Sequence, residues 1–230
     1  MYCKSFFLTS IMVTALAVSS GDAAIVVTNG DFETPDIGEG AQIQDVPDWF
    51  DSTVGFTTWH RGESTDPQEN GTQLLAMGPG SGDAYVYQSL GTLDFNSGTL
   101  NWSLEQTRFA DGNGSAGVFL RFYSGDPTGT PADGTEISTL GLTQIGSDVQ
   151  IDAIGTDSSG TGSLFPSGSV DLTGLSAGTQ IWIELEGFVD GGSGFAPFDN
   201  ISVTEVPEPA SLALLGMGGL LVSRRRKVDA

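Results

Sequence analysis

Cysteine is almost absent from this sequence of 230 residues, which holds only Cys3. Cys3 lies in an N-terminal stretch with one lysine, Lys4, an apolar core from about residue 6 to 18 and small residues up to 24, the pattern of a secretory signal peptide. Removal of residues 1–24 leaves a mature chain without cysteine, so disulfides are excluded as its means of stabilisation. The same pattern predicts that the chain is exported.

Basic residues are scarce as well. Residues 25–205 contain three arginines and no lysine against 26 acidic residues, a net charge of −23. Nucleic acid is excluded as a partner, because phosphate binding requires positive charge. The acidic surface is explained either as a solvated face or as a source of oxygen ligands for calcium, a hard cation.

Histidine occurs once, as His60, and no nucleophile elbow, zinc-ligand spacing or phosphate-binding loop accompanies it. We therefore expect a protein that is not an enzyme. A glycosidase that uses a carboxylate pair such as Glu105 and Glu184 is a weaker alternative, because so many acidic residues yield a plausible pair by chance.

Helical periodicity and internal repeats are also lacking between residues 25 and 205. Short runs of β-branched and aromatic residues alternate with clusters of Gly, Asp, Asn and Pro, which predicts an all-β, two-sheet antiparallel sandwich of the jelly-roll type in one domain. The predicted strands are 25–28, 55–60, 73–77, 84–90, 99–107, 117–123, 149–154, 168–172, 179–187 and 200–205.

The C-terminal segment 206–227 has three parts in a fixed order. Its parts are the tripeptide Pro207, Glu208 and Pro209, an uncharged apolar run at 210–222, and the basic residues Arg224, Arg225, Arg226 and Lys227. A membrane-spanning helix needs about 20 apolar residues, so the run predicts only a short span, with the basic cluster on the cytoplasmic side. A plain tail anchor is the alternative interpretation.

This order of features resembles the PEP-CTERM sorting signal of bacterial exported proteins. The resemblance implies that an exosortase, a membrane-embedded cysteine-dependent transpeptidase or protease, recognises the Pro207–Glu208–Pro209 motif while the arginines hold the orientation. It also implies a transient inner-membrane stage, removal of the tail, and delivery of the domain to the cell surface or extracellular matrix.

Two further motifs, NGDFE at 29–33 and FDNISV at 198–203, resemble the galactose-binding-like jelly rolls that include several carbohydrate-binding modules. The resemblance implies that the first and last strands lie side by side. It also implies a structural calcium ion held by Glu33 and Asp199, with Asp31 as a third candidate and backbone carbonyls near 70–72 completing the sphere. The alternative is that Asp31 and Glu33 cap a turn and Asp199 satisfies a strand end.

Period-2 alternation gives the strands at 99–107, 117–123 and 179–187 one apolar face and one mixed face. If the mixed faces share a sheet, aromatic rings lie among hydrogen-bonding groups, a combination suited to sugar rings. The predicted carbohydrate site comprises Tyr85, Glu105, Phe119, Arg121, Tyr123, Trp182 and Glu184. The alternative is a set of cross-strand pairs on a half-covered sheet.

These features together predict a noncatalytic exported protein that binds carbohydrate or exopolysaccharide. A purely structural matrix protein without a sugar site is the main alternative. A concave cleft with exposed rings favours the first interpretation, and a flat or covered face favours the second.

Overall fold

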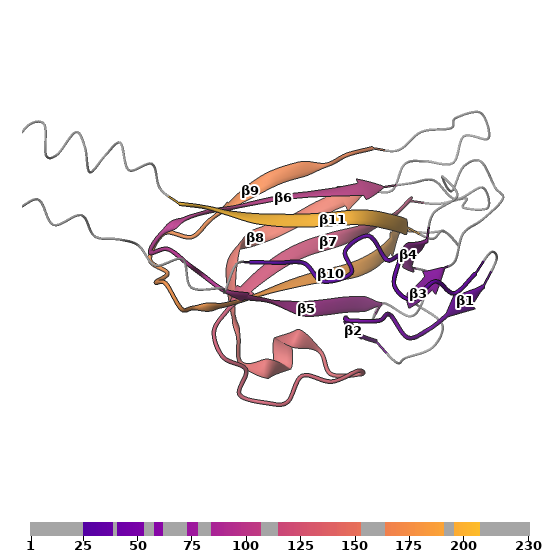
Figure 1. The fold of residues 1–230 in the computed structure, drawn as a ribbon, viewed down its shortest axis with the longest axis horizontal. Coiled ribbons are helices and arrows are strands. Elements are labelled where there is room, and N and C mark those ends of the chain that lie inside the picture. The colour runs from indigo at the N-terminus through magenta and orange to yellow at the C-terminus, as the bar shows by residue number, and fades with distance from the viewer. Residues whose placement is uncertain are drawn as a thin grey trace, which may run out of the picture.

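The computed structural model describes residues 25–38, 41–52, 58–61, 73–77, 84–106, 115–152, 164–190 and 196–207. The predicted two-sheet antiparallel sandwich is confirmed (Figure 1). One sheet has six strands in the order β1-β3-β4-β11-β6-β9, and the other has five in the order β2-β5-β10-β7-β8. All of the strand pairs described are antiparallel.

The six-stranded sheet consists of β1 (Gln42–Ile43), β3 (Thr58–Arg61), β4 (Leu74–Met77), β6 (Gly98–Gln106), β9 (Ser167–Asp171) and β11 (Ala196–Pro207). The five-stranded sheet consists of β2 (Phe50–Asp51), β5 (Tyr85–Thr92), β7 (Ser115–Ser124), β8 (Thr143–Asp152) and β10 (Gln180–Asp190). A single 3-10 turn, η1 (Ile137–Leu140), lies in the connection from β7 to β8.

The core lies between the two sheets and is built by the apolar faces that the alternation predicts. Leu100 on β6, Leu120 on β7 and Ile183 on β10 are each at most 1% exposed and belong to one cluster. Burial of such side chains is the main favourable term in folding, at about 25 cal/mol per Å² of apolar surface. The pattern works because successive residues of a strand point to opposite faces.

The two ends of the domain meet, as the NGDFE and FDNISV motifs predict. The amide of Ile201 on β11 donates to the carbonyl of Gly30 at 2.8 Å. A side chain at Gly30 would not fit, because a Cβ there would lie 2.3 Å from the carbonyl oxygen of Ile201. The predicted strand at 25–28, however, is not a strand. Thr28 is instead held by the side chain of Gln88, whose Oε1 accepts from the Thr28 amide at 2.9 Å and whose Nε2 donates to the Thr28 carbonyl at 3.1 Å.

At the C-terminal end, β11 continues to Pro207, which pairs with Gly98 at the start of β6. The first proline of the sorting tripeptide therefore belongs to the last strand of the sandwich. The described part of the chain holds no helix with the length and apolarity needed to cross a membrane. The signal peptide at 1–24 and the apolar run at 210–222 lie outside the described residues.

Candidate functional site

Most of the predicted carbohydrate site gathers on the outer face of the five-stranded sheet. Between β10 and β7, Trp182 lies opposite Tyr123, Glu184 opposite Arg121, and Glu186 opposite Phe119. Tyr85 of β5 joins the same face, because it pairs with Glu186 from the other side. Period-2 alternation places these side chains together, since residues that pair across a ladder share a face.

Glu105 does not belong to this group, because the condition that the three mixed faces share a sheet is not met. Its strand, β6, lies in the six-stranded sheet between β11 and β9. There Glu105 Oε2 accepts a hydrogen bond at 2.9 Å from the side-chain Nδ2 of Asn200, which also donates to Asp199 Oδ2 at 3.2 Å. Glu105 and Glu184 therefore do not form a carboxylate pair across one face, which removes the pair named for a glycosidase.

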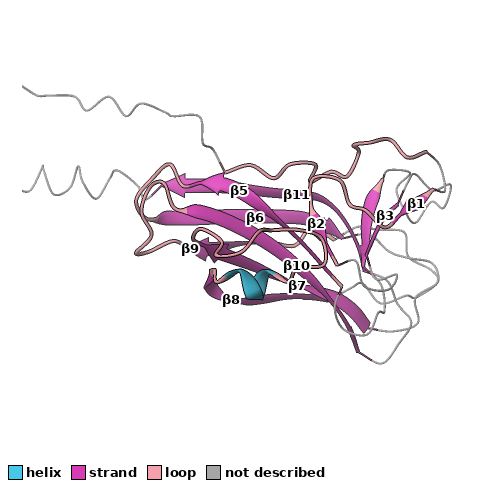
Figure 2. Cartoon of the chain, turned by 90° about the horizontal axis from the view of Figure 1, so that it is seen from below, coloured by secondary structure: helices cyan, strands magenta, loops and turns pink. Residues whose placement is uncertain are grey.

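Part of the outer face is covered by residues 125–142, here called the cap segment (Figure 2). Ile137 and Leu140 of the cap segment are at most 1% exposed and pack in a small second core with rings of the sheet. The rings so covered are Tyr85, Tyr87, Tyr123 and Trp182, each at most 7% exposed. The expectation that Tyr85, Tyr123 and Trp182 form an exposed platform is therefore corrected.

Polar contacts hold the cap segment in this position. The indole Nε1 of Trp182 donates to the carbonyl of Gly125 at 3.2 Å, and the hydroxyl of Tyr87 donates to the carbonyl of Ala132 at 3.2 Å. The amide of Gly134 donates to the carbonyl of Asp51 on β2 at 2.8 Å. Buried Tyr and Trp side chains need such partners for their polar atoms, and here the cap segment supplies them.

Arg121 lies on the outer face, next to the part that the cap segment covers. Its guanidinium binds three carboxylates. Its Nη2 lies 3.0 Å from Asp148 of β8, and its Nη1 lies 3.2 Å from Glu184 and also contacts Glu186. Burial opposes the charge of Arg121, but hydrogen bonds to Asp148 and Glu186 outweigh it and raise the pKa of the guanidinium. These contacts hold the guanidinium in place and keep it positively charged.

Glu184 is the buried member of this network. Its carboxylate is 7% exposed and accepts a hydrogen bond at 2.8 Å from the hydroxyl of Tyr123. Burial raises the pKa of Glu184, while Tyr123 and Arg121 oppose that rise by favouring the charged form. Burial, and then the charge of Glu184, raises the pKa of Tyr123, so that its hydroxyl stays protonated and donates.

The part of the sheet beyond the cap segment presents Phe119, Arg121, Asp148, Glu186 and Phe188, here called the open face. The rings of Phe119 and Phe188 lie 4.8 Å apart, centroid to centroid, and the guanidinium carbon of Arg121 lies 5.3 Å from the Phe119 ring centroid. Both rings are half-buried. Asp148 and Glu186 have side chains 42% and 33% exposed.

Sequence reasoning missed Phe188 and Asp148 as members of the open face. Phe188 has the same parity on its strand as Trp182, Glu184 and Glu186, so the alternation extended by two residues would have found it. Asp148 had no such signal, because the predicted strand in that region began only at residue 149, whereas β8 begins at Thr143.

The three acidic residues predicted as calcium ligands have protein partners. Glu33 Oε1 accepts from the amide of Gln73 at 3.1 Å, Asp31 Oδ1 accepts from the Glu33 amide at 3.5 Å, and Asp199 Oδ1 accepts from the Asn200 amide at 2.6 Å. Within the described residues no three acidic, histidine or cysteine side chains come together as a metal cluster. The carbonyls near 70–72 lie outside the described residues, so calcium binding stays a prediction.

Residues 205–227 match a family model described as the PEP-CTERM protein-sorting motif. The chain carries a PEP-CTERM sorting signal. Such a signal implies an exported protein, in agreement with the predicted signal peptide. The match covers Pro207, Glu208 and Pro209 and the arginines Arg224, Arg225 and Arg226, as the sequence predicts. No curated protein matches the sequence at a significant level.

Several solved structures resemble this sandwich. One, titled "CBM4 structure and function", is 13% identical with a TM-score of 0.44, covering 78% of this chain and 99% of its own. The CBM22-1 xylan-binding domain of Paenibacillus barcinonensis Xyn10C is 12% identical with a TM-score of 0.45, covering 82% and 99%. The K3 adhesin domain of Lys-gingipain from Porphyromonas gingivalis W83 is 15% identical with a TM-score of 0.45, covering 78% and 99%. Similarity at this level carries no argument about what this chain binds.

Proposed function

We propose that this protein is a noncatalytic component of the cell surface or extracellular matrix that binds polysaccharide through the open face. The observation that carries the proposal is the half-exposed pair of Phe119 and Phe188 beside Arg121. A sugar ring offers an apolar face of C–H groups and a rim of hydroxyls. Aromatic rings pack against the C–H face, and charged groups form hydrogen bonds with the hydroxyls.

The open face is preorganised for such a contact. Arg121 is bound on three sides by Asp148, Glu184 and Glu186, so its position does not have to be ordered when a ligand arrives. Gly117 supplies room for the aromatic pair, because a Cβ there would lie 2.6 Å from Cζ of Phe188. Groups that are already fixed lose little conformational entropy on binding, which favours affinity.

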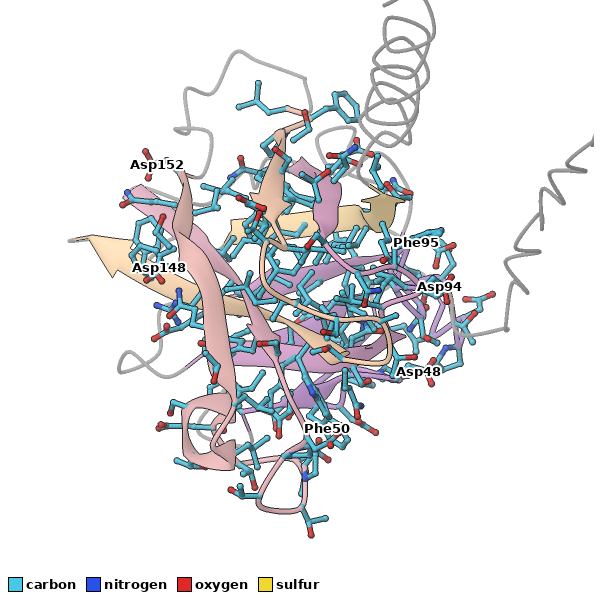
Figure 3. All side chains as sticks on the ribbon, turned by 90° about the vertical axis from the view of Figure 1, so that its left-hand side faces the viewer. Asp48, Phe50, Asp94, Phe95, Asp148 and Asp152 are labelled. Atoms are coloured by element: carbon cyan, nitrogen blue, oxygen red, sulfur yellow. The ribbon has the colours of Figure 1, made fainter. Side chains whose placement is uncertain are left out.

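The test is retention of the purified protein in gels that contain neutral and acidic polysaccharides. Phe119→Ala and Phe188→Ala are expected to reduce retention at least tenfold, about 1.4 kcal/mol. Phe95→Ala is the matched control, since Phe95 is also half-buried but lies on the opposite flank from Asp148 (Figure 3). Equal retention of all three variants and of the wild type would contradict a role for the open face.

A structural matrix protein without a sugar site is the second candidate. The observation that favours it is the burial of Tyr85, Tyr123 and Trp182 under the cap segment, which leaves only part of the sheet open. This candidate predicts that the wild-type protein is retained by none of the polysaccharides.

The proposed processing partner is an exosortase that recognises Pro207, Glu208 and Pro209 during a transient membrane stage and removes the tail. The sorting motif supports this step. Mass spectrometry of the native protein is expected to find a C-terminus upstream of residue 224. A native chain that keeps Arg224, Arg225 and Arg226 would contradict removal of the tail.

A further inference from the structure

A separate opening lies at the edge of the sandwich, where the two sheets part between their edge strands β8 and β9. This edge groove has a volume of about 430 Å³, within the range of about 300 to 1,000 Å³ for small-molecule sites. Ile151 and Asp152 from the end of β8 form one side, and Leu164 and Phe165, just before β9, form the other. Asp152, labelled in Figure 3, marks this end of β8.

The wall of the edge groove contains buried polar atoms that have no partner. Gln106 is 1% exposed, yet neither its Oε1 nor its Nε2 makes a hydrogen bond; the indole Nε1 of Trp102, 7% exposed, makes none either. Within the described residues these are the only buried side-chain nitrogen and oxygen atoms in that state. Buried donors and acceptors are nearly always paired, and an unpaired one destabilises the fold, so three together need an explanation.

The backbone of Gln106 and the indole of Trp102 are held firmly in place. The backbone of Gln106 exchanges two hydrogen bonds with Leu164, each 2.9 Å long. The Trp102 indole lies flat against Gly168, where a Cβ would be 2.7 Å from Cζ2 and 3.0 Å from Nε1. The Trp102 indole and the backbone that carries Gln106 are therefore fixed parts of the groove wall.

The rest of the groove is mostly apolar, with Gln150 and Asp152 as its further polar residues, and its rim is exposed. Phe165 is 69% exposed and Leu164 is 53% exposed, which makes them two of the four exposed large hydrophobic side chains among the described residues. The only charged group in the lining is Asp152. In a domain with a net charge of −23 this repels anions, so an anionic ligand is disfavoured in the groove.

We infer that the edge groove is a second binding site, which takes a single neutral sugar unit. The apolar face of the sugar packs on Phe165, and its hydroxyls donate to Gln106 Oε1 and accept from Gln106 Nε2 and Trp102 Nε1. Hydroxyl groups meet this demand because each can both donate and accept. The inference shares only its ligand class with the proposed function, and it concerns another surface.

The test is an NMR titration of the full mature protein with glucose, galactose, mannose and xylose. The indole N–H signal of Trp102, assigned through its loss in Trp102→Phe, and the side-chain amide signals of Gln106 are expected to shift and saturate with at least one sugar. Glucuronate, the charged control, is expected to bind at least tenfold more weakly. Absence of any shift with all four sugars up to their solubility limits overturns the inference.

Two variants separate a binding role from a structural one. Gln106→Leu is expected to melt a few degrees higher than the wild type, because it removes two unpaired buried polar atoms, and yet to lose the sugar-induced shifts. Phe165→Ala is expected to keep its melting temperature, because the ring is exposed, and to bind at least tenfold more weakly. A Gln106→Leu variant that melts lower, or that binds sugar as the wild type does, overturns the inference.

The proposals for the two sites can be refuted independently of each other. Phe119→Ala on the open face is expected to leave the sugar-induced shifts of Trp102 and Gln106 unchanged, whereas Phe165→Ala is expected to leave retention on polysaccharide gels unchanged. A wild-type protein that is retained on the gels but shows no sugar-induced shifts therefore refutes the edge groove alone. A wild-type protein that shows the shifts but is not retained refutes the open face alone.

Discussion

Replacing Arg121 by Met tests the electrostatics of the open face most directly. The substitution keeps much of the apolar stem but removes the cation that Glu184 faces at 3.2 Å. Because the Glu184 carboxylate is 7% exposed, it is left buried beside Glu186 with the hydroxyl of Tyr123 as its remaining hydrogen-bond partner. Breaking a buried pair on one side is more damaging than replacing both partners.

The expected loss follows from the burial of the two groups. Breaking a fully buried pair costs about 3–5 kcal/mol, and with Arg121 itself 16% exposed we take the lower end, about 3 kcal/mol at pH 8. The contact with Asp148 adds little, because that side chain is 42% exposed and its charge is screened. For a domain of this size the loss lowers the melting temperature by roughly 6–12 °C.

The loss depends on pH with a defined sign. Burial raises the pKa of folded Glu184 above its ordinary value of 4.5, and removing Arg121 removes an interaction that lowers it. A group with a raised folded pKa contributes stability that is complete below its unfolded pKa and is lost as pH rises through the folded pKa. The deficit of Arg121→Met against the wild type is therefore largest at pH 8 and shrinks toward pH 4.

Urea unfolding at pH 8, 6 and 4 measures this deficit. The control is the double variant Arg121→Met with Glu184→Gln, in which no buried charge remains, and it is expected to recover most of the loss at pH 8. A deficit that is the same at every pH and persists in the double variant would refute the electrostatic reasoning and leave lost packing as the cause.

Three further predictions concern other parts of the sandwich. Burial raises the pKa of Asp51 to about 6. The protonated carboxyl therefore contributes stability at low pH that is lost as pH rises through that value. Asp51→Asn is expected to raise the free energy of unfolding, measured in urea, by about 2 kcal/mol at pH 8 and not at all at pH 3. Gly117→Ala is expected to lose more than about 2 kcal/mol, because its Cβ would lie 2.3 Å from the Ile151 carbonyl oxygen, whereas Gly174→Ala, with nothing within 4 Å but a φ of +89°, is expected to lose about 1 kcal/mol. If calcium binds Glu33 and Asp199, calorimetry is expected to show a higher melting temperature with calcium than with chelator, and Glu33→Gln is expected to remove that difference.

Each of these has an opposite outcome that counts against it. A gain for Asp51→Asn that is equal at both pH values points to something other than the charge. Equal losses for the two glycine variants would mean that the close approach at Gly117 relaxes freely. Melting that is indifferent to calcium and chelator would remove the calcium site.

Local sequence determined which face of each strand points inward, and it contains the sorting signal. Alternation at Leu100, Leu120 and Ile183 marks the core side, because side-chain direction in a strand depends only on parity. The sorting signal is likewise legible in the sequence, since its three parts are contiguous. The meeting of the two ends, seen at Gly30 and Ile201, followed from a resemblance between short motifs.

The candidate site, in contrast, was decided by tertiary structure. Parity shows that Glu105 and Glu184 each point away from the core, but it does not show that β6 and β10 belong to different sheets. Nor does it show that Ile137 and Leu140 of the cap segment join a buried cluster with the rings of the sheet, because a loop rich in turn-forming residues has no periodicity that reveals what it covers. Gln106 has the parity of a core residue, and only the opening between β8 and β9 makes its unpaired amide part of a groove. The parity of a residue depends on its own strand alone. The sheet to which a strand belongs, the loop that covers its face and the hydrogen-bond partners of its side chains depend on contacts between segments distant in the chain.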